Sequence, residues 1–132
     1  MLWYSMAELS LNHRAPVIIL DVEITGRFTE TAKLALDTGS THLLLPWRIA
    51  KALGLQLESS SQRIETITAS GSEFAPLVFL PSVKVLGKEA RNVSAIVRDL
   101  PPKSYVDGLL GLSFLKNFKL TLDFKEGILR LE

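Results

Sequence analysis

The chain has 132 residues, of which 47% are hydrophobic and 22% charged, so it can bury one core and fits a single domain. Lys and Arg number 15 against 14 for Asp and Glu, and the charges are scattered, so no basic face indicates a nucleic-acid or acidic partner. Cysteine is absent, which excludes disulfides and thiolate catalysis, and His13 and His42 match no metal-binding spacing. We expect no metal and no cofactor.

The amino end of the chain contains Leu2, Trp3 and Tyr4 but lacks a basic leader, a long apolar stretch and a small-residue cleavage site. We interpret it as cytoplasmic or as part of a segment cut from a larger protein. Residues 1–15 leave three alternatives open: disorder, an origin outside the natural protein, or an added strand in the sheet of a dimer. The longest apolar runs elsewhere are strand-sized, so we expect nothing in this chain to span a membrane.

Eight short segments are rich in β-branched and aromatic residues and are bounded by glycine, proline or small polar residues, which is the pattern of β-strands. In chain order the predicted strands cover residues 16–25, 28–36, 64–69, 73–80, 82–86, 93–97, 119–124 and 128–131. This share of strand is far above that of an average globular chain. The sequence therefore predicts an all-β fold.

Two short helices are expected between these strands. Pro46 can occupy the first position of one helix, and Gly54 suits the left-handed conformation that ends it. The other helix is predicted over residues 113–118, where Phe114 and Phe118 have helical spacing.

A protruding hairpin is predicted over residues 63–80, with two strand-like arms around the polar segment Ser70-Gly71-Ser72. The small residues of this segment favour a mobile tip centred on Gly71. An ordinary hairpin turn explains the same pattern equally well.

Residues 34–41 are the best guide to function, because an apolar strand ends there in Asp37, set on the turn Thr38-Gly39. A carboxylate at the end of a buried strand loses hydration, so it persists only if its charge is hydrogen-bonded, shared with another group or used. Alone, Asp-Thr-Gly is weak support for catalysis. The alternative is a structural turn whose carboxylate caps backbone amides.

The flanking segments change that judgement. The strand before Asp37, the apolar run and helix after it, the glycine-tipped hairpin and the later Leu109-Leu110-Gly111 resemble, in order and spacing, the retropepsin-like aspartic proteases. The resemblance covers residues 16–132 and is closest to single-domain bacterial members. It implies a single-lobed domain with a flap hairpin, a two-fold homodimer, and endopeptidase activity on a peptide or protein substrate.

The resemblance also assigns roles around the catalytic turn. Asp37 would be the catalytic residue, and because no other aspartate in the chain carries a hydroxyl-glycine turn, its partner would be the Asp37 of a second chain. Thr38 would bond across the dimer axis, and Gly39 would let the backbone pass close to the two carboxylates and the substrate. Ser40 holds a position from which its hydroxyl could donate to the Asp37 carboxylate and favour the charged form, which suggests an acidic activity optimum.

The remaining implied roles concern the substrate. Ser70, Gly71 and Ser72 would form the tip of the flap, while Thr41 and His42 occupy positions where retroviral members commonly carry acidic residues that bind the substrate backbone. Leu109-Leu110-Gly111 would pack beneath the catalytic turn as structural support. An apolar cleft lining is expected, which favours cleavage between apolar side chains; the residues expected in it are Leu43, Leu44, Ile67 and Phe74.

Two other functions remain open from the sequence. One is a non-enzymatic dimerisation or peptide-binding module that keeps the fold but does not turn over, although such a role would tolerate asparagine or alanine at position 37. The other is one domain of a longer protein whose remaining parts supply location and substrate.

Overall fold

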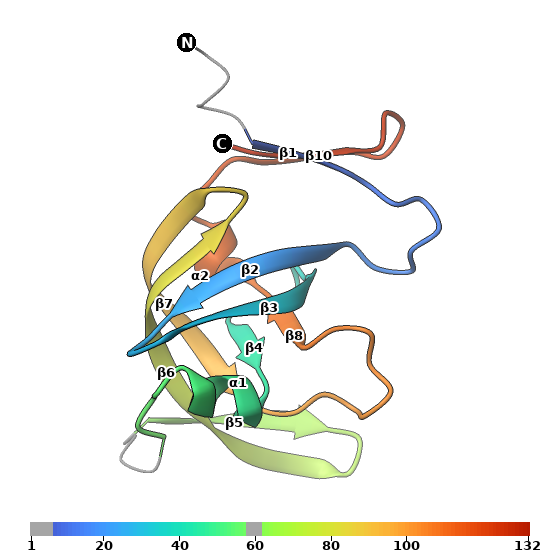
Figure 1. Ribbon diagram of the computed structural model, residues 1–132. Coiled ribbons are helices and arrows are strands. Elements are labelled where there is room, and N and C mark those ends of the chain that lie inside the picture. Colours follow the sequence, from blue (N-terminus) through green and yellow to red (C-terminus); the bar gives the residue numbers. More distant parts are fainter. Residues whose placement is uncertain (1–6, 58–61) are drawn as a thin grey trace.

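The computed structural model describes residues 7–57 and 62–132, which contain ten strands and two short helices (Figure 1). Leu2, Trp3 and Tyr4 lie outside the described residues. The elements are β1 (Ala7–Ser10), β2 (Ile19–Thr25), β3 (Thr29–Leu36), β4 (Leu43–Leu45), α1 (Trp47–Ala52), β5 (Arg63–Thr68), β6 (Gly71–Val85), β7 (Lys88–Val97), β8 (Gly108–Leu110), α2 (Leu112–Leu115), β9 (Leu120–Asp123) and β10 (Ile128–Leu131).

Seven strands form one sheet in the order β2-β3-β8-β4-β7-β6-β5, and an additional pairing of β2 with β6 closes six of them into a ring. Closing a sheet on itself removes the unpaired edges that would otherwise attract other strands. β5 lies outside the ring and, among the described strands, pairs with β6 alone, so the hairpin β5–β6 projects from the barrel (Figure 1).

The core follows from the alternation of side chains along these strands. In β2 the residues Leu20, Val22 and Ile24 are buried, whereas Asp21 and Glu23 are exposed. The same alternation on the other strands fills the barrel with aliphatic side chains, and helix residues such as Ile49 and Phe114 belong to the same cluster. Each fully buried side chain of this size stabilises the fold by about 1.5–3 kcal/mol, because its apolar surface is removed from water.

A second, three-stranded sheet has the order β1-β10-β9 and lies to one side of the barrel (Figure 1). β1 pairs antiparallel with β10, from Ala7 opposite Leu131 to Ser10 opposite Ile128. Residues 7–10 of the amino-terminal extension are therefore a strand in the chain's own sheet. The buried Leu129 and Leu131 of β10 join the main hydrophobic cluster, so the two sheets share one core.

The strand content predicted from the sequence is confirmed as a mostly-β fold with short helices, but three strands were missed. β4 and β8 have three residues each and no polar–apolar alternation, and β1 lies in the extension. The two strands predicted on either side of Pro81 are one continuous strand, β6. Pro81 does not end this strand because pairing resumes around it, with Leu80 opposite Val93 and Ser82 opposite Arg91.

The helices differ from prediction only at their ends. α1 begins at Trp47, directly after Pro46, and Gly54 has a φ of 76°, the left-handed conformation expected there. α2 ends at Leu115 instead of residue 118. The side-chain amide of Asn117 donates to the carbonyl oxygens of Ser113 (3.2 Å) and Phe114 (2.9 Å), which satisfies carbonyls that a further helical turn would otherwise use.

Candidate active site

Asp37 lies where β3 leaves the barrel, and its backbone amide donates to the carbonyl oxygen of Leu110 in β8 (3.0 Å). The turn closes on the aspartate itself: Gly39 N donates to Asp37 Oδ1 (3.0 Å) and Ser40 N donates to the Asp37 carbonyl oxygen (3.2 Å). Asp37 is half-buried, while Thr38 and Gly39 are exposed. The sheet thus fixes the backbone of the carboxylate and leaves one side of the turn open.

The segment after β8 supports the turn from below. Leu112 N donates to the Ser40 carbonyl oxygen (2.8 Å), and Ser113 N donates to that of Thr41 (2.9 Å). Gly111 is buried at this junction, and a Cβ added to it would lie closer than 3.0 Å to the carbonyl oxygens of Ser40 and His42. Only glycine leaves room for this close approach of two backbones.

Ser40 does not have the partner expected from the sequence. Its hydroxyl donates to the carbonyl oxygen of His42 (2.8 Å), and a serine hydroxyl has a single proton to donate. The expected donation to the Asp37 carboxylate is therefore wrong for this arrangement. Ser40 instead stabilises the backbone of residues 40–42, so the reason given for an acidic optimum does not hold.

His42 connects the turn to the barrel wall. Its Nδ1 lies 2.6 Å from Ser94 Oγ in β7, and Ser113 Oγ donates to the Ser94 carbonyl oxygen (2.8 Å). Burial lowers the pKa of the imidazole from its ordinary value, and the nearby positive charge of Lys116 lowers it further. The neighbouring Thr41, in contrast, is exposed.

We expect this depressed pKa to make stability depend on pH. The unfolded chain binds a proton at His42 more readily than the folded chain, so the contribution to stability is complete above the ordinary histidine pKa of about 6.5 and is lost as the pH falls below it. Denaturant unfolding between pH 7.5 and 5 should show His42→Gln losing less stability than the parent over this range. Equal losses in both proteins would contradict the assignment.

An apolar row crosses the outer face of the barrel beside Asp37. Ala35 in β3 is opposite Leu109 in β8, Leu109 is opposite Leu44 in β4, and Leu44 is opposite Ile96 in β7. Successive residues of a strand alternate between faces, so Ala35 and Asp37 lie on the same side. We call these four side chains the apolar row; Leu109, Leu44 and Ile96 are half-buried.

The row corrects part of the expected cleft lining. Leu43 is fully buried in the core and does not line a cleft, whereas Leu44 faces outward as expected. In the segment Leu109-Leu110-Gly111, Leu110 is fully buried beneath the turn, but Leu109 belongs to the outer face.

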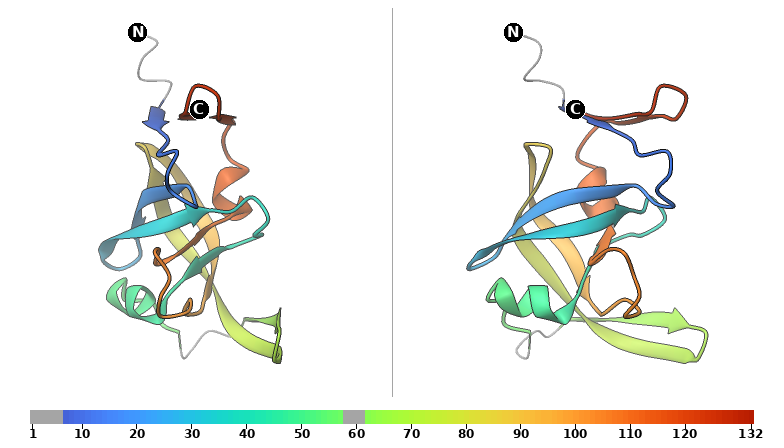
Figure 2. Two further views of the ribbon diagram at one scale, coloured as in Figure 1. Left: turned by 90° about the vertical axis from the view of Figure 1, so that its right-hand side faces the viewer. Right: turned by 45° about the vertical axis from the view of Figure 1, so that its right-hand side comes forward.

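The hairpin β5–β6 projects on the same side of the barrel as the turn that carries Asp37 (Figure 2). Its tip is the two-residue turn formed by Ala69 and Ser70, and Gly71, with a φ of 126°, is the first residue of β6. Gly71 was expected at the tip and instead follows it, next to the exposed Ser72.

Two large apolar side chains of the hairpin are open to solvent, Ile67 at 87% and Phe74 at 68% exposure. Phe74 is opposite Glu65, so it shares a face with Ile67. Thr66 and Glu73 lie on the other face, and both contact Arg98 at the end of β7. The expectation that Ile67 and Phe74 line the cleft with Leu44 does not match this arrangement, because their face is turned away from Arg98.

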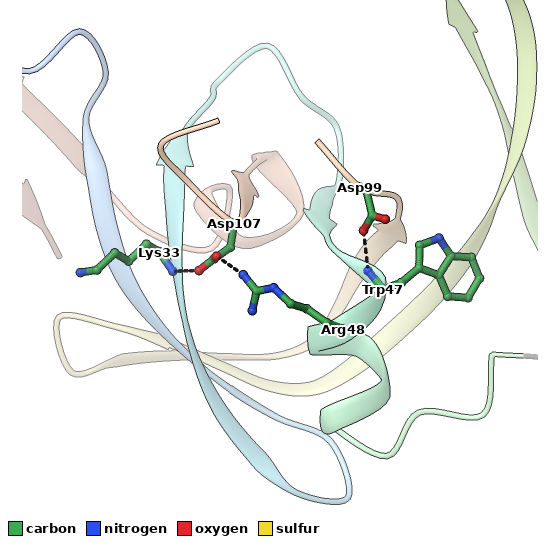
Figure 3. A network of polar contacts seen from close by, with 5 residues as sticks. All are labelled: Lys33, Trp47, Arg48, Asp99 and Asp107. Atoms are coloured by element: carbon green, nitrogen blue, oxygen red, sulfur yellow. Dashed lines mark hydrogen bonds and ion pairs between the residues drawn. The ribbon is translucent and has the colours of Figure 1, made fainter. Parts of the chain in front are cut away.

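The other described aspartates each have a hydrogen-bond or ion-pair partner within the chain. Asp107 accepts the backbone amide of Lys33 (2.8 Å) and pairs with Arg48, and Asp99 accepts the backbone amide of Trp47 (3.0 Å) at the start of α1 (Figure 3). Asp21 pairs with Lys33 (2.9 Å), and Asp123 accepts the amide of Glu126 (2.9 Å).

The contacts of Asp99 and Asp107 could not be found from the sequence, because each joins residues more than fifty positions apart. Within residues 7–57 and 62–132, no group of three or more His, Asp or Glu side chains is arranged to hold a metal ion.

Comparison with known proteins identifies the family. A family described as "gag-polyprotein putative aspartyl protease" matches residues 20–117, about three quarters of the chain, including Asp37 and the segment beneath it. The chain belongs to this aspartyl protease family. The crystal structure of a retropepsin-like aspartic protease from Rickettsia conorii is similar to it, with a TM-score of 0.74 and 26% sequence identity over 96% of this chain and 89% of that one. The fold of this family member is therefore retropepsin-like.

A protein from Sinorhizobium sp., described as an uncharacterized protein in the cobV 5' region, is 28% identical to this aspartyl protease family member over 122 residues. The match covers 86% of the chain and 51% of the relative, so the chain spans about half of that protein's length. Among the described residues, no helix combines the length and apolar character needed to cross a membrane.

Proposed function

We propose that the chain is an aspartic endopeptidase that works as a homodimer, with Asp37 of each subunit facing its copy across a two-fold axis. The observation that carries this proposal is the state of Asp37: it is half-buried on an open glycine turn, and among the described residues its carboxylate accepts only the amide of Gly39. Since the other described aspartates all make structural contacts, a second copy is the natural source of the second carboxylate.

Two carboxylates that face each other across the axis would share one proton, because both cannot be charged at short range. The charged carboxylate would take a proton from a water molecule as it attacks the peptide carbonyl, while the protonated carboxylate donates to the carbonyl oxygen. Gly39 admits the substrate backbone, since a Cβ there would lie 3.3 Å from Asp37 Oδ1. Thr38, whose side chain is exposed, would bond to the partner turn.

The substrate would lie extended between the apolar row and the hairpin β5–β6. The row begins next to Asp37 and is made of aliphatic side chains, so we propose apolar residues on either side of the scissile bond. The hairpin would supply backbone hydrogen bonds to the peptide and exclude water when it closes. In this role Ser70, Gly71 and Ser72 form or flank its tip, and Thr41 and His42 border the floor.

The dependence of cleavage on protein concentration tests the dimer. An unbiased peptide mixture is incubated with the protein at several pH values, with and without a statine-type inhibitor. We expect inhibitor-sensitive cleavage whose rate per chain rises with concentration and levels off once sedimentation shows a dimer. Activity per chain that is independent of concentration, from protein that sediments as a monomer, would contradict the proposal.

A catalytically silent peptide-binding module is the alternative. It predicts that protein shown to be dimeric binds peptides in the cleft but cleaves none at any pH. The two functions are distinguished by the same assay, read by mass spectrometry for products and by fluorescence anisotropy for binding.

A further inference from the structure

Arg98 lies between the apolar row and the hairpin β5–β6. β7 ends at Val97, and Arg98 follows it directly, two residues after Ile96, so Arg98 lies on the same outer face as Ile96 of the apolar row. Its backbone amide donates to the Leu45 carbonyl oxygen (2.8 Å), which keeps this residue in line with β4. The backbone of Arg98 is thus held by the barrel.

The guanidinium reaches the inner face of the hairpin. Arg98 Nη1 donates to Thr66 Oγ1 (3.4 Å), and Nη2 lies 3.8 Å from Glu73 Oε2. Thr66 and Glu73 are opposite each other in the pairing of β5 with β6, so a single cation touches both arms. An extended peptide entering between the row and the hairpin must pass beside this cation.

We propose that Arg98 is a specificity-determining residue whose guanidinium binds an acidic side chain of the substrate. When no substrate is bound, Glu73 pairs with the same guanidinium. This inference rests on the proposed protease function. The Glu73 contact is long, and the side chains of Arg98 and Glu73 are 35% and 58% exposed, so the pair is weak. A guanidinium presents five donors in a planar fork, and a carboxylate that meets it with two parallel bonds displaces a carboxylate that does not.

Other charged groups near this point do not satisfy Arg98. Asp99, the next residue, directs Oδ1 to the backbone amide of Trp47. Asp107, at the other end of the same loop, is held by Arg48 and by the Lys33 amide (Figure 3). Glu73 is therefore the carboxylate that a substrate would replace.

The distance from Asp37 gives the substrate position that Arg98 would read. β3 and β7 are separated by β8 and β4 and run in opposite directions, so Asp37 lies two residues beyond Ala35 on one side of the apolar row and Arg98 lies two residues beyond Ile96 on the other. With strands about 4.8 Å apart and a rise of about 3.3 Å per residue, the separation is about 14 Å across the sheet and about 13 Å along the strands, which is on the order of 20 Å between the catalytic turn and Arg98. An extended peptide advances about 3.3 Å per residue, which places the acidic residue roughly six positions from the scissile bond.

The test uses one cleaved peptide carrying Glu, Gln or Lys at each of the outer positions, with Arg98→Gln, Arg98→Lys and Glu73→Gln as variants. We expect the parent to prefer Glu over Gln roughly tenfold in kcat/KM at one position, since a charge-assisted pair is about this much stronger than a neutral one. Arg98→Gln should remove the preference, Arg98→Lys should reduce it, and Glu73→Gln should strengthen it because the competing carboxylate is gone.

Glu73→Gln and Arg98→Gln both break the same ion pair, which makes each the control for the other. If Arg98 only tied the hairpin to the barrel, the two variants would change the cleavage of all peptides alike, and that result would overturn the inference. Unchanged Glu preference in Arg98→Gln would overturn it as well. A parent protein that cleaves no peptide at all contradicts the proposed protease function, whereas cleavage without an Arg98-dependent preference contradicts this inference alone.

Discussion

Asp37→Asn is expected to abolish peptide cleavage, with kcat/KM falling by roughly three orders of magnitude or more, because acid-base catalysis at the dyad is lost. Asparagine has nearly the same shape and keeps an oxygen that can accept the Gly39 amide, which lies 3.0 Å from Asp37 Oδ1. The fold and the turn should therefore survive. Initial rates with a cleaved peptide, together with thermal unfolding of both proteins, check the prediction.

Mixing the variant with the parent sharpens this test. Each site is assumed to need one Asp37 from each subunit, and the two chains are mixed in equal amounts and re-associate at random. About a quarter of all dimers then carry two aspartates, and these contain half of the parent chains. The activity per parent chain therefore falls to roughly half that of unmixed parent dimers. An enzyme complete in one chain would show no such loss. Residual activity in Asp37→Asn close to that of the parent would remove Asp37 from catalysis.

Gly111→Ala is expected to give a large loss of stability, about 3 kcal/mol in the free energy of unfolding, and to disturb the turn that carries Asp37. The added Cβ would fall closer than 3.0 Å to two carbonyl oxygens, those of Ser40 and His42. Both belong to backbone that is held by further hydrogen bonds, including Leu112 N to Ser40 O (2.8 Å), so neither can move away freely. Urea denaturation measures the loss.

Gly87→Ala is the matched control. Gly87 has a φ of 78°, and a Cβ built there has no atom within 4 Å, so the change adds backbone strain without a clash. Strain of this kind is expected to amount to about 1 kcal/mol. If Gly111→Ala lowers the free energy of unfolding no more than Gly87→Ala does, the backbone around position 111 can move to accommodate the added Cβ, and the prediction is wrong.

Much of the fold follows from local patterns in the sequence. The hairpin that leads to Asp37, the helix before Gly54 and the projecting hairpin each carry their own alternation and turn residues, and all three are present in the structure, with the tip of the projecting hairpin shifted from Gly71 to the two preceding residues. β4 and β8 could not be recognised in the same way. They are three-residue strands whose extended form depends on neighbours brought in from distant parts of the chain, and an apolar run of that length has no period.

The candidate site shows the same division. Asp37 and Gly111 stand out in the sequence because their residue types are special, and the structure places them on opposite sides of one turn. The partner of Ser40 was mispredicted because a hydroxyl can rotate between a carboxylate and a carbonyl, and the choice depends on the path of the backbone through residue 42. Arg98 carries no local signal at all; only the folded hairpin brings Thr66 and Glu73 to it.

β6 pairs with β5 from Gly71 to Pro76, and from Leu77 onward it pairs with β7 and so belongs to the barrel, where β2 joins it from Ser82 to Val85. The outer part of β6, residues 71–76, is thus attached to the barrel at one end and free at the other. With a rise of about 3.3 Å per residue, the five residues beyond Pro76 extend roughly 17 Å, and a bend of only about 10° at the attached end moves the tip by about 3 Å, the length of one hydrogen bond. Closing on a peptide would then require no unfolding and no separate hinge loop, and the elasticity of one strand would set how readily the cleft admits its substrate.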